Sequence, residues 1–149
     1  MVKEICVYGS QSGRCIAEKE QFFDEMANEW DLHKVDEFVW SRGDFHGHVG
    51  KWLHGFEGGH GGNGIGERNV EERMQLEFCD EKELCVANTW FRKTEKRKLN
   101  FSAGGNETET DFVLVGRKNI KYLRDMKTIP GELQHGLVVA DLNKRKVKK

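Results

Sequence analysis

Eight glycines fall within residues 50–66, GKWLHGFEGGHGGNGIG, and they constrain the fold more than any other feature of the chain. Glycine has the most backbone entropy to lose on folding, so we expect neither a helix nor a strand there. A loop of this length inside a compact domain is usually functional or mobile. It contains His54 and His60, which could be ligands, although we interpret them as solvent-facing loop histidines.

Hydrophobic periodicity predicts two helices and seven strands outside this segment. Residues 17–30 place Phe22, Met26 and Trp30 at a four-residue spacing, which is typical of the buried stripe of a helix. Residues 67–83 repeat the pattern. Short β-branched or apolar runs predict strands at 4–10, 36–41, 84–91, 98–104, 110–116, 122–129 and 136–142. Several strands interrupted by two helices indicate a mixed α/β domain with a substantial sheet.

The net charge of −1 over 149 residues gives no global basic field that would attract a nucleic acid. Positive charge is local, at 92–98, 116–124 and 143–149. The last of these is either a solvated end or an arm that attracts phosphate. The four cysteines form no CxxC pair, and we interpret them as reduced, intracellular thiols rather than zinc ligands. No apolar run reaches the roughly 18–20 residues of a membrane span.

Polar residues gather where the predicted strands end, which is where α/β proteins place their sites. Asp44 follows a strand and precedes His46. Three alternatives are open for this pair, which are metal binding, proton transfer and no functional role. Asp111 and His135 each stand just before an apolar strand. If those strands are neighbours, the carboxylate of Asp111 could accept the ring N–H of His135 and select its tautomer. The alternative is two unrelated surface residues.

Six short motifs occur in order along nearly the whole chain: VYGSQSG, GDFHGHVG, GGHGGNGIGERN, LCVANTWF, TDFVLV and LQHGLVVADL. Together they resemble the endonuclease/exonuclease/phosphatase superfamily. More narrowly, they resemble the apurinic-type endonuclease domain of RTE-like non-LTR retrotransposons, a group that includes the proteins labelled craniofacial development protein 2. The alternative is a complete, unrelated small α/β domain.

This resemblance implies a four-layered α/β sandwich and Mg²⁺-dependent hydrolysis of a DNA phosphodiester, in an intracellular, nuclear protein. Carried over by position, Tyr8 would lie near the scissile phosphate, and Asp44 would orient or deprotonate the attacking water and bind the metal weakly. Asp111 would support the active-site histidine, and His135 would be that histidine. Contacts to DNA are expected from Asn106, Thr108, Arg117 and Lys118.

Two positions depart from the family's pattern. His46 stands where the family has an asparagine, and its imidazole is bulkier and changes charge with pH. Gln134 stands where a carboxylate available to a metal is common. We also expect residues 1–142 to lack the family domain's first half, including its main glutamate ligand, with 143–149 as a basic tail. Weak activity is therefore expected, and the competing interpretation is a non-catalytic remnant that binds nucleic acid or protein.

Two structural expectations complete the hypothesis. Residues 4–9, 36–41, 111–115 and 137–142 should share one sheet. One apolar face of that sheet should lack a partner, which would favour self-association or marginal stability through exposed apolar surface. The alternative is that the strands rearrange to close a smaller core.

Overall fold

The computed structural model describes the chain in nine segments, and the statements below concern only those residues. The segments are 2–8, 15–33, 37–45, 55–64, 70–94, 97–103, 106–108, 111–129 and 137–143.

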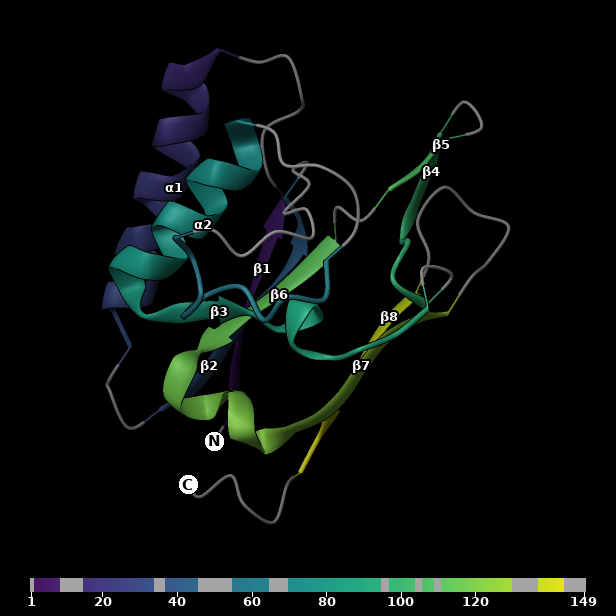
Figure 1. Ribbon diagram of the computed structural model, residues 1–149. Helices are drawn as coiled ribbons and strands as arrows, with labels where there is room; N and C mark the ends of the chain where they lie inside the picture. The colour runs from purple at the N-terminus through teal and green to yellow at the C-terminus, as the bar shows by residue number, and fades with distance from the viewer. Residues whose placement is uncertain are drawn as a thin grey trace.

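A four-stranded mixed sheet forms the centre of the molecule, in the order β1–β2–β6–β3 (Figure 1). β1 and β2 are parallel, while β6 is antiparallel to both β2 and β3. A parallel pair needs a crossover connection, and the first helix lies between β1 and β2 in the chain. The bounds are β1 Val2–Tyr8, β2 Phe38–Asp44, β3 Leu84–Val86 and β6 Asp111–Gly116.

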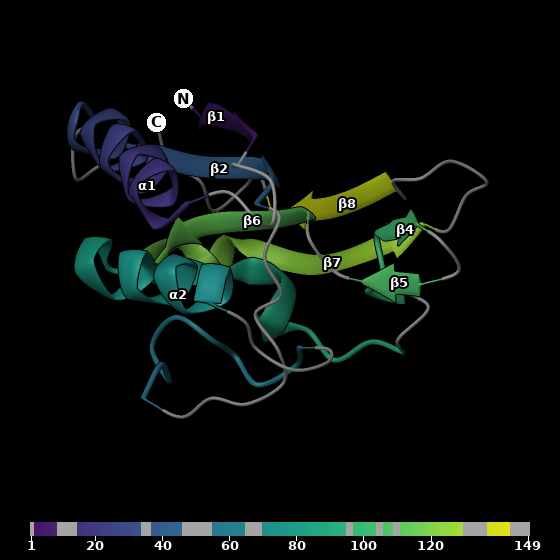
Figure 2. The same ribbon diagram turned by 90° about the horizontal axis from the view of Figure 1, so that it is seen from above.

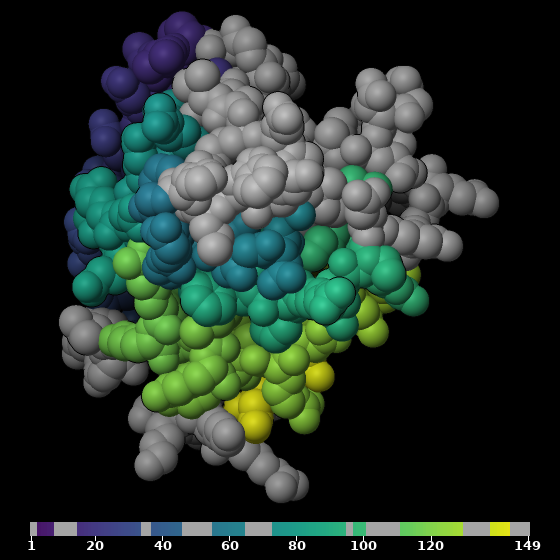
Figure 3. Space-filling model, viewed as in Figure 1, coloured from purple at the N-terminus to yellow at the C-terminus, as the bar shows by residue number. Residues whose placement is uncertain are grey.

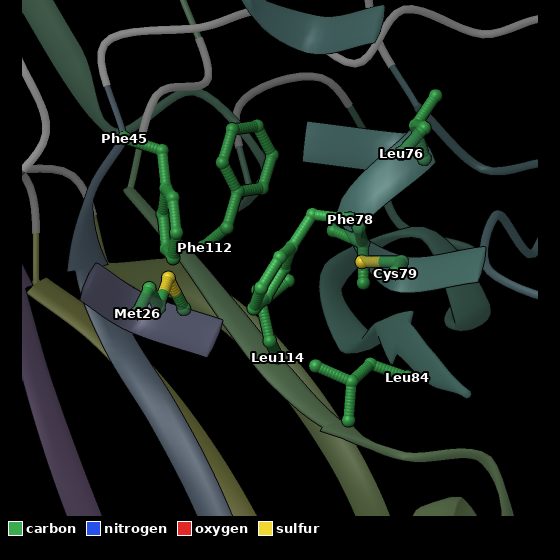
Figure 4. Packing of buried hydrophobic residues seen from close by; sticks show 9 residues of the cluster. Met26, Phe45, Leu76, Phe78, Cys79, Leu84, Phe112 and Leu114 are labelled. Atoms are coloured by element: carbon green, nitrogen blue, oxygen red, sulfur yellow. The ribbon is translucent and has the colours of Figure 1, made fainter. Parts of the chain in front are cut away.

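Two helices, α1 (Ile16–Asp31) and α2 (Val70–Lys82), lie side by side on one face of this sheet (Figures 1 and 2). Beneath them, Met26 of α1 and Phe78 of α2 meet Phe112 and Leu114 of β6 in one buried cluster (Figure 4). Phe45, which follows β2, joins this cluster and packs against the ring of Phe112. The apolar stripe predicted for residues 17–30 is therefore confirmed as part of the core.

A second, two-stranded sheet covers the opposite face of the central sheet. β7 (Leu123–Ile129) pairs with β8 (Leu137–Leu142) in antiparallel register. Leu123 and Met126 of β7 are buried with Val113 and Val115 of β6, and half-buried side chains of β8 pack against the same cluster. The described chain thus has three layers, helices, sheet and sheet (Figure 2).

This arrangement corrects two of the expectations. Residues 137–142 do not join the sheet that holds 4–9, 36–41 and 111–115, because β8 pairs with β7 instead. The uncovered apolar face is also wrong for β6, since Phe112, Val113, Leu114 and Val115 are each at most 4% exposed. Alternate residues of this strand pack on the helices and on β7, which explains why the whole run FVLV is apolar.

Two predicted strands are shorter than expected. Within 84–91, only β3 is a strand, and the 3-10 helix η1 (Ala87–Trp90) follows it. The Thr89 hydroxyl donates to the carbonyl of Val86 at 2.7 Å, a local bond that favours a turn over an extended chain. Within 98–104, the strand is β4 (Phe101–Ala103), paired with β5 (Asn106–Thr108). The 3-10 helix η3 (Arg117–Tyr122) separates β6 from β7.

The glycine-rich segment is described over residues 55–64, which contain turns and neither helix nor strand, as predicted. These residues are tied to β3 and η1: Val86 N donates to Gly59 O, and Asn63 N donates to Thr89 O. His60 is fully buried, and its Nδ1 accepts from Gly62 N at 2.9 Å. The expectation of a solvent-facing His60 is therefore wrong. His54 lies outside the described residues.

Candidate functional site

Three of the predicted site residues fall in one row across the central sheet. In the strand register, Tyr8 is the partner of Asp44 on β2, and Asp44 is the partner of Asp111 on β6. Neighbouring strands lie about 4.8 Å apart, so the three Cα atoms span roughly 10 Å. The row stands where parallel β1 and β2 both end and antiparallel β6 begins. Sequence-distant residues 8, 44 and 111 therefore meet at one sheet edge.

The position of Asp44 is set by the residues on either side of it. Gly43 has φ +148°, and a Cβ there would overlap the backbone carbonyl oxygen of Val7 on β1. Phe45 is 4% exposed and anchors the strand end in the core beneath the helices. Because successive strand residues point to opposite faces, burial of Phe45 turns the Asp44 carboxylate toward the β7–β8 side. Asp44 is itself only 6% exposed.

Two asparagine side chains hold the backbone of Asp111. Asn100 donates from Nδ2 to Asp111 O at 2.8 Å and accepts from Asp111 N at 3.0 Å. Asn88 donates to the same carbonyl at 3.0 Å and accepts from Val113 N at 2.9 Å. Both amides are buried, and they supply the bonds that a further strand would otherwise make. The start of β6, and with it Asp111, is thereby held by two side chains.

A buried lysine supports this arrangement. Lys98 is 5% exposed, and its Nζ donates to Asn88 O at 2.5 Å. The carbonyl of Lys98 accepts from the Thr128 hydroxyl of β7 at 3.3 Å. Residues 98–100 therefore connect the central sheet to the second sheet directly behind Asp111.

A cavity of about 380 Å³ adjoins the row on the β7–β8 side. Apolar parts of Trp40, Val138 and Ala140 line it together with Asp111. At its polar side Arg42 Nε donates to Glu4 Oε1 at 2.5 Å, so this charged pair is satisfied within the chain.

Several predicted site residues lie outside the described residues. These are His46, Gln134 and His135, so the proposed approach of Asp111 to His135 stays a prediction. Tyr8 and Asp44, both assigned to the site by the resemblance, are partners in the strand register.

The residues predicted to contact DNA divide between the two ends of β6. Thr108 closes β5 only three residues before Asp111, which keeps it within about 11 Å, and Asn106 lies at the other end of β5. Arg117 and Lys118 begin η3 at the opposite end of β6, about 20 Å from Asp111. Figure 1 shows η3 and the β4–β5 hairpin at opposite ends of the sheet.

Arg117 is held by the chain itself. Its guanidinium donates to Leu84 O at 3.0 Å and to Asp80 Oδ1 at 2.5 Å, which ties β6 to β3 and to the end of α2. Lys93 pairs with Asp125 at 2.7 Å and Arg124 with Asp141 at 3.0 Å. Part of the local positive charge at 92–98 and 116–124 is therefore paired within the fold.

The donor chemistry of the row fits Mg²⁺ held jointly with a substrate. Asp44 and Asp111 bring two hard carboxylates to one sheet edge, and Mg²⁺ in phosphoryl-transfer sites commonly uses one or two carboxylates, waters and a substrate phosphate. Among the residues that the structure describes, no group of three or more His, Cys, Asp or Glu side chains could hold a metal ion.

Comparison with known proteins identifies the fold. No protein-family profile matches the sequence, and no curated protein matches it. Among solved structures, the chain is similar to the endonuclease domain of TRAS1, a telomere-specific non-LTR retrotransposon, with a TM-score of 0.60 at 11% sequence identity. The chain has the fold of that endonuclease domain. The match covers 91% of this chain and 55% of the TRAS1 chain, so the chain spans about half the length of that domain.

In the TRAS1-like fold, the predicted mixed α/β class is confirmed, with a mixed four-stranded sheet and flanking helices. Sequence pattern alone did not single out Asn100 and Lys98. Their one local signal is that both are polar residues within the predicted strand KLNFSAG. The alternation of polar and apolar residues in a strand would place both side chains on the face toward solvent.

Among the described residues, no helix has the length and the apolar character needed to span a membrane.

Proposed function

We propose that this chain is a retrotransposon-derived, Mg²⁺-dependent DNA endonuclease-like domain of the RTE-like group, acting on phosphodiester bonds. The observation that carries the proposal is the register row of Tyr8, Asp44 and Asp111 at one edge of a retrotransposon endonuclease fold. Strand ends at such an edge are where α/β proteins gather reactive side chains.

The two carboxylates of the row have chemical roles in this proposal. Asp44 orients the attacking water or accepts its proton, which requires a carboxylate within hydrogen-bond reach of that water. Asp111 supports His135 as negative charge develops on the phosphate. Asp44 would hold a magnesium ion, and that ion would supply Lewis-acid polarisation of the phosphoryl oxygen. The asparagine contacts keep Asp111 in place, so that little reorganisation is needed during the reaction.

A second candidate function is nucleic-acid binding without hydrolysis. It is favoured by His46 and Gln134, which stand where the family pattern has an asparagine and a carboxylate available to a metal. In this case the row and the neighbouring β4–β5 hairpin would contact the backbone of DNA, and Gln134 and His46 would mark lost catalytic positions.

Nicking of supercoiled plasmid in Mg²⁺ separates the two functions. Asp44→Asn, Asp111→Asn and His135→Ala are compared with Asp141→Asn, an exposed position of β8 whose pairing with Arg124 is worth little in water. We expect the first three to lose nicking and the control to keep it. Anisotropy of labelled DNA, measured in EDTA, reports binding separately. If the wild-type chain binds DNA without nicking it, the second candidate function is supported. If the wild-type chain neither binds nor nicks DNA, both candidate functions are contradicted.

A further inference from the structure

Charge is divided unequally between the layers of the molecule. α1 and α2 carry eleven Asp and Glu residues against three Lys and Arg residues, a net charge of −8. The rest of the chain carries fourteen acidic and twenty-one basic residues, a net charge of +7. The near-neutral total therefore hides an acidic helical layer. Such a layer repels nucleic acid, so any DNA is expected to approach the opposite side.

A groove of about 370 Å³ runs between the two helices on this acidic surface. Its floor is apolar: Phe23 and Met74 are half-buried, and Ile16, at the start of α1, is 54% exposed. The surfaces of α1 and α2 lie next to each other along one flank of the molecule (Figure 3). From residue 16 to residue 27 the groove side of α1 extends about 17 Å, enough for about three turns of another helix.

The rim of the groove is built from like charges. Glu20 and Asp24 stand one turn apart on α1, and Glu77 and Glu81 stand one turn apart on α2, all exposed and all lining the groove. Like charges at this spacing destabilise a helix, so folding alone gives no reason for two such pairs along one groove. Arg73 is the basic residue of the lining, and it lies 3.9 Å from Glu77. A cationic partner would relieve the repulsion.

We propose that the α1–α2 groove is a docking site for a basic amphipathic helix of a partner protein. An apolar stripe at i, i+3, i+4 and i+7 would cover Ile16, Phe23 and Met74, while lysines and arginines beside the stripe would face the carboxylates of the rim. The attraction between the opposite charges adds specificity and speeds the encounter. This surface is on the helical layer, whereas the proposed catalytic row faces the β7–β8 side.

The test uses a fluorescein-labelled leucine–lysine peptide of about three to four helical turns, with its leucines at helical spacing. The control peptide has the same composition, but its leucines are dispersed so that they form no apolar stripe. Binding to the full chain is followed by anisotropy at low and physiological salt. Glu20→Gln/Asp24→Asn and Glu77→Gln/Glu81→Gln are compared with Glu25→Gln/Glu29→Gln, which removes two charges from α1 outside the groove lining.

We expect each rim variant to weaken binding of the amphipathic peptide at least about tenfold, and the control variant to weaken it less than about twofold, since the rim charges act at short range. The dispersed peptide should bind at least about tenfold more weakly than the amphipathic one. Circular dichroism confirms that the variants are folded.

Three results would overturn the proposal. One is equal weakening by the rim and control variants, which would reveal only a diffuse acidic field. Another is the absence of saturable binding to the wild-type chain. The third is a wild-type dimer in sedimentation that the Glu77→Gln/Glu81→Gln variant dissociates, which would assign the groove to a second copy of this chain.

Discussion

Asn100 holds both backbone groups of Asp111, donating to its carbonyl at 2.8 Å and accepting from its N–H at 3.0 Å. Asn100 is 1% exposed, so the bonds are made without competition from water. The side chain of Asn100 therefore satisfies backbone hydrogen-bonding groups of β6 at Asp111, a residue of the candidate site.

Replacing Asn100 by alanine should lower the free energy of unfolding by about 2–3 kcal/mol, because the buried N–H of Asp111 would lose its acceptor. Urea denaturation measures the loss. Asn28→Ala, on the exposed side of α1, is the control and should change stability by less than about 0.5 kcal/mol. Equal stability of the two variants would show that the contact is not needed.

Gly43→Ala should destabilise the fold by about 2–3 kcal/mol, because φ of +148° is strained for alanine and its Cβ would overlap the carbonyl oxygen of Val7. Gly55→Ala is the matched comparison. Gly55 also has a positive φ, +81°, but a Cβ there meets nothing within 4 Å, so about 1 kcal/mol is expected. Thermal unfolding measures the stability of both variants. If Gly43→Ala destabilises the fold less than Gly55→Ala does, the close approach of β1 and β2 is contradicted.

The buried cysteines should make stability fall at high pH. Burial raises the pKa of the Cys85 thiol from 9.0 to about 12, and burial also raises the pKa of Cys79. As the pH rises, the thiols of the unfolded chain lose their protons before those of the folded chain. The contribution of the buried thiols to the free energy of unfolding is therefore fully present below pH 9 and is lost as the pH rises toward 12. The expected slope is about 1.4 kcal/mol per pH unit for each thiol.

Urea titrations at several pH values, compared with Cys85→Ala, measure the contribution of this thiol. The same burial predicts that iodoacetamide labels exposed Cys6 and Cys15 in the folded protein, and Cys79 and Cys85 only after unfolding. Rapid labelling of all four in native conditions would argue against the core described above.

Arg117→Ala should reduce stability by about 1–3 kcal/mol, because its guanidinium bonds Leu84 O and Asp80. Lys118→Ala, at the next position and exposed, should change stability by less than about 0.5 kcal/mol. Denaturation and DNA anisotropy are measured on both variants. A loss of DNA affinity in Arg117→Ala with unchanged stability would support the sequence-based prediction of a DNA contact.

Features that depend on local pattern were predictable from the amino-acid sequence. The four-residue spacing of Phe22, Met26 and Trp30 predicted α1, and the apolar run before Gly116 predicted β6. The motif resemblance selected Tyr8, Asp44 and Asp111, and the register then placed them in one row. The predictions of α1 and β6 are confirmed because periodicity records which face of an element is buried.

Tertiary structure decided the features that depend on partners distant in the chain. β8 pairs with β7 and not with the central sheet. An apolar strand such as Leu137–Leu142 fits either sheet, and its pairing is decided by the neighbours that it meets in space. His60 became buried because the glycine-rich turns pack on β3 and η1, and Asn100 became a backbone partner because Asp111 lies beside it. Burial and hydrogen bonding of a polar side chain depend on what surrounds it in space, and local sequence pattern does not record those surroundings.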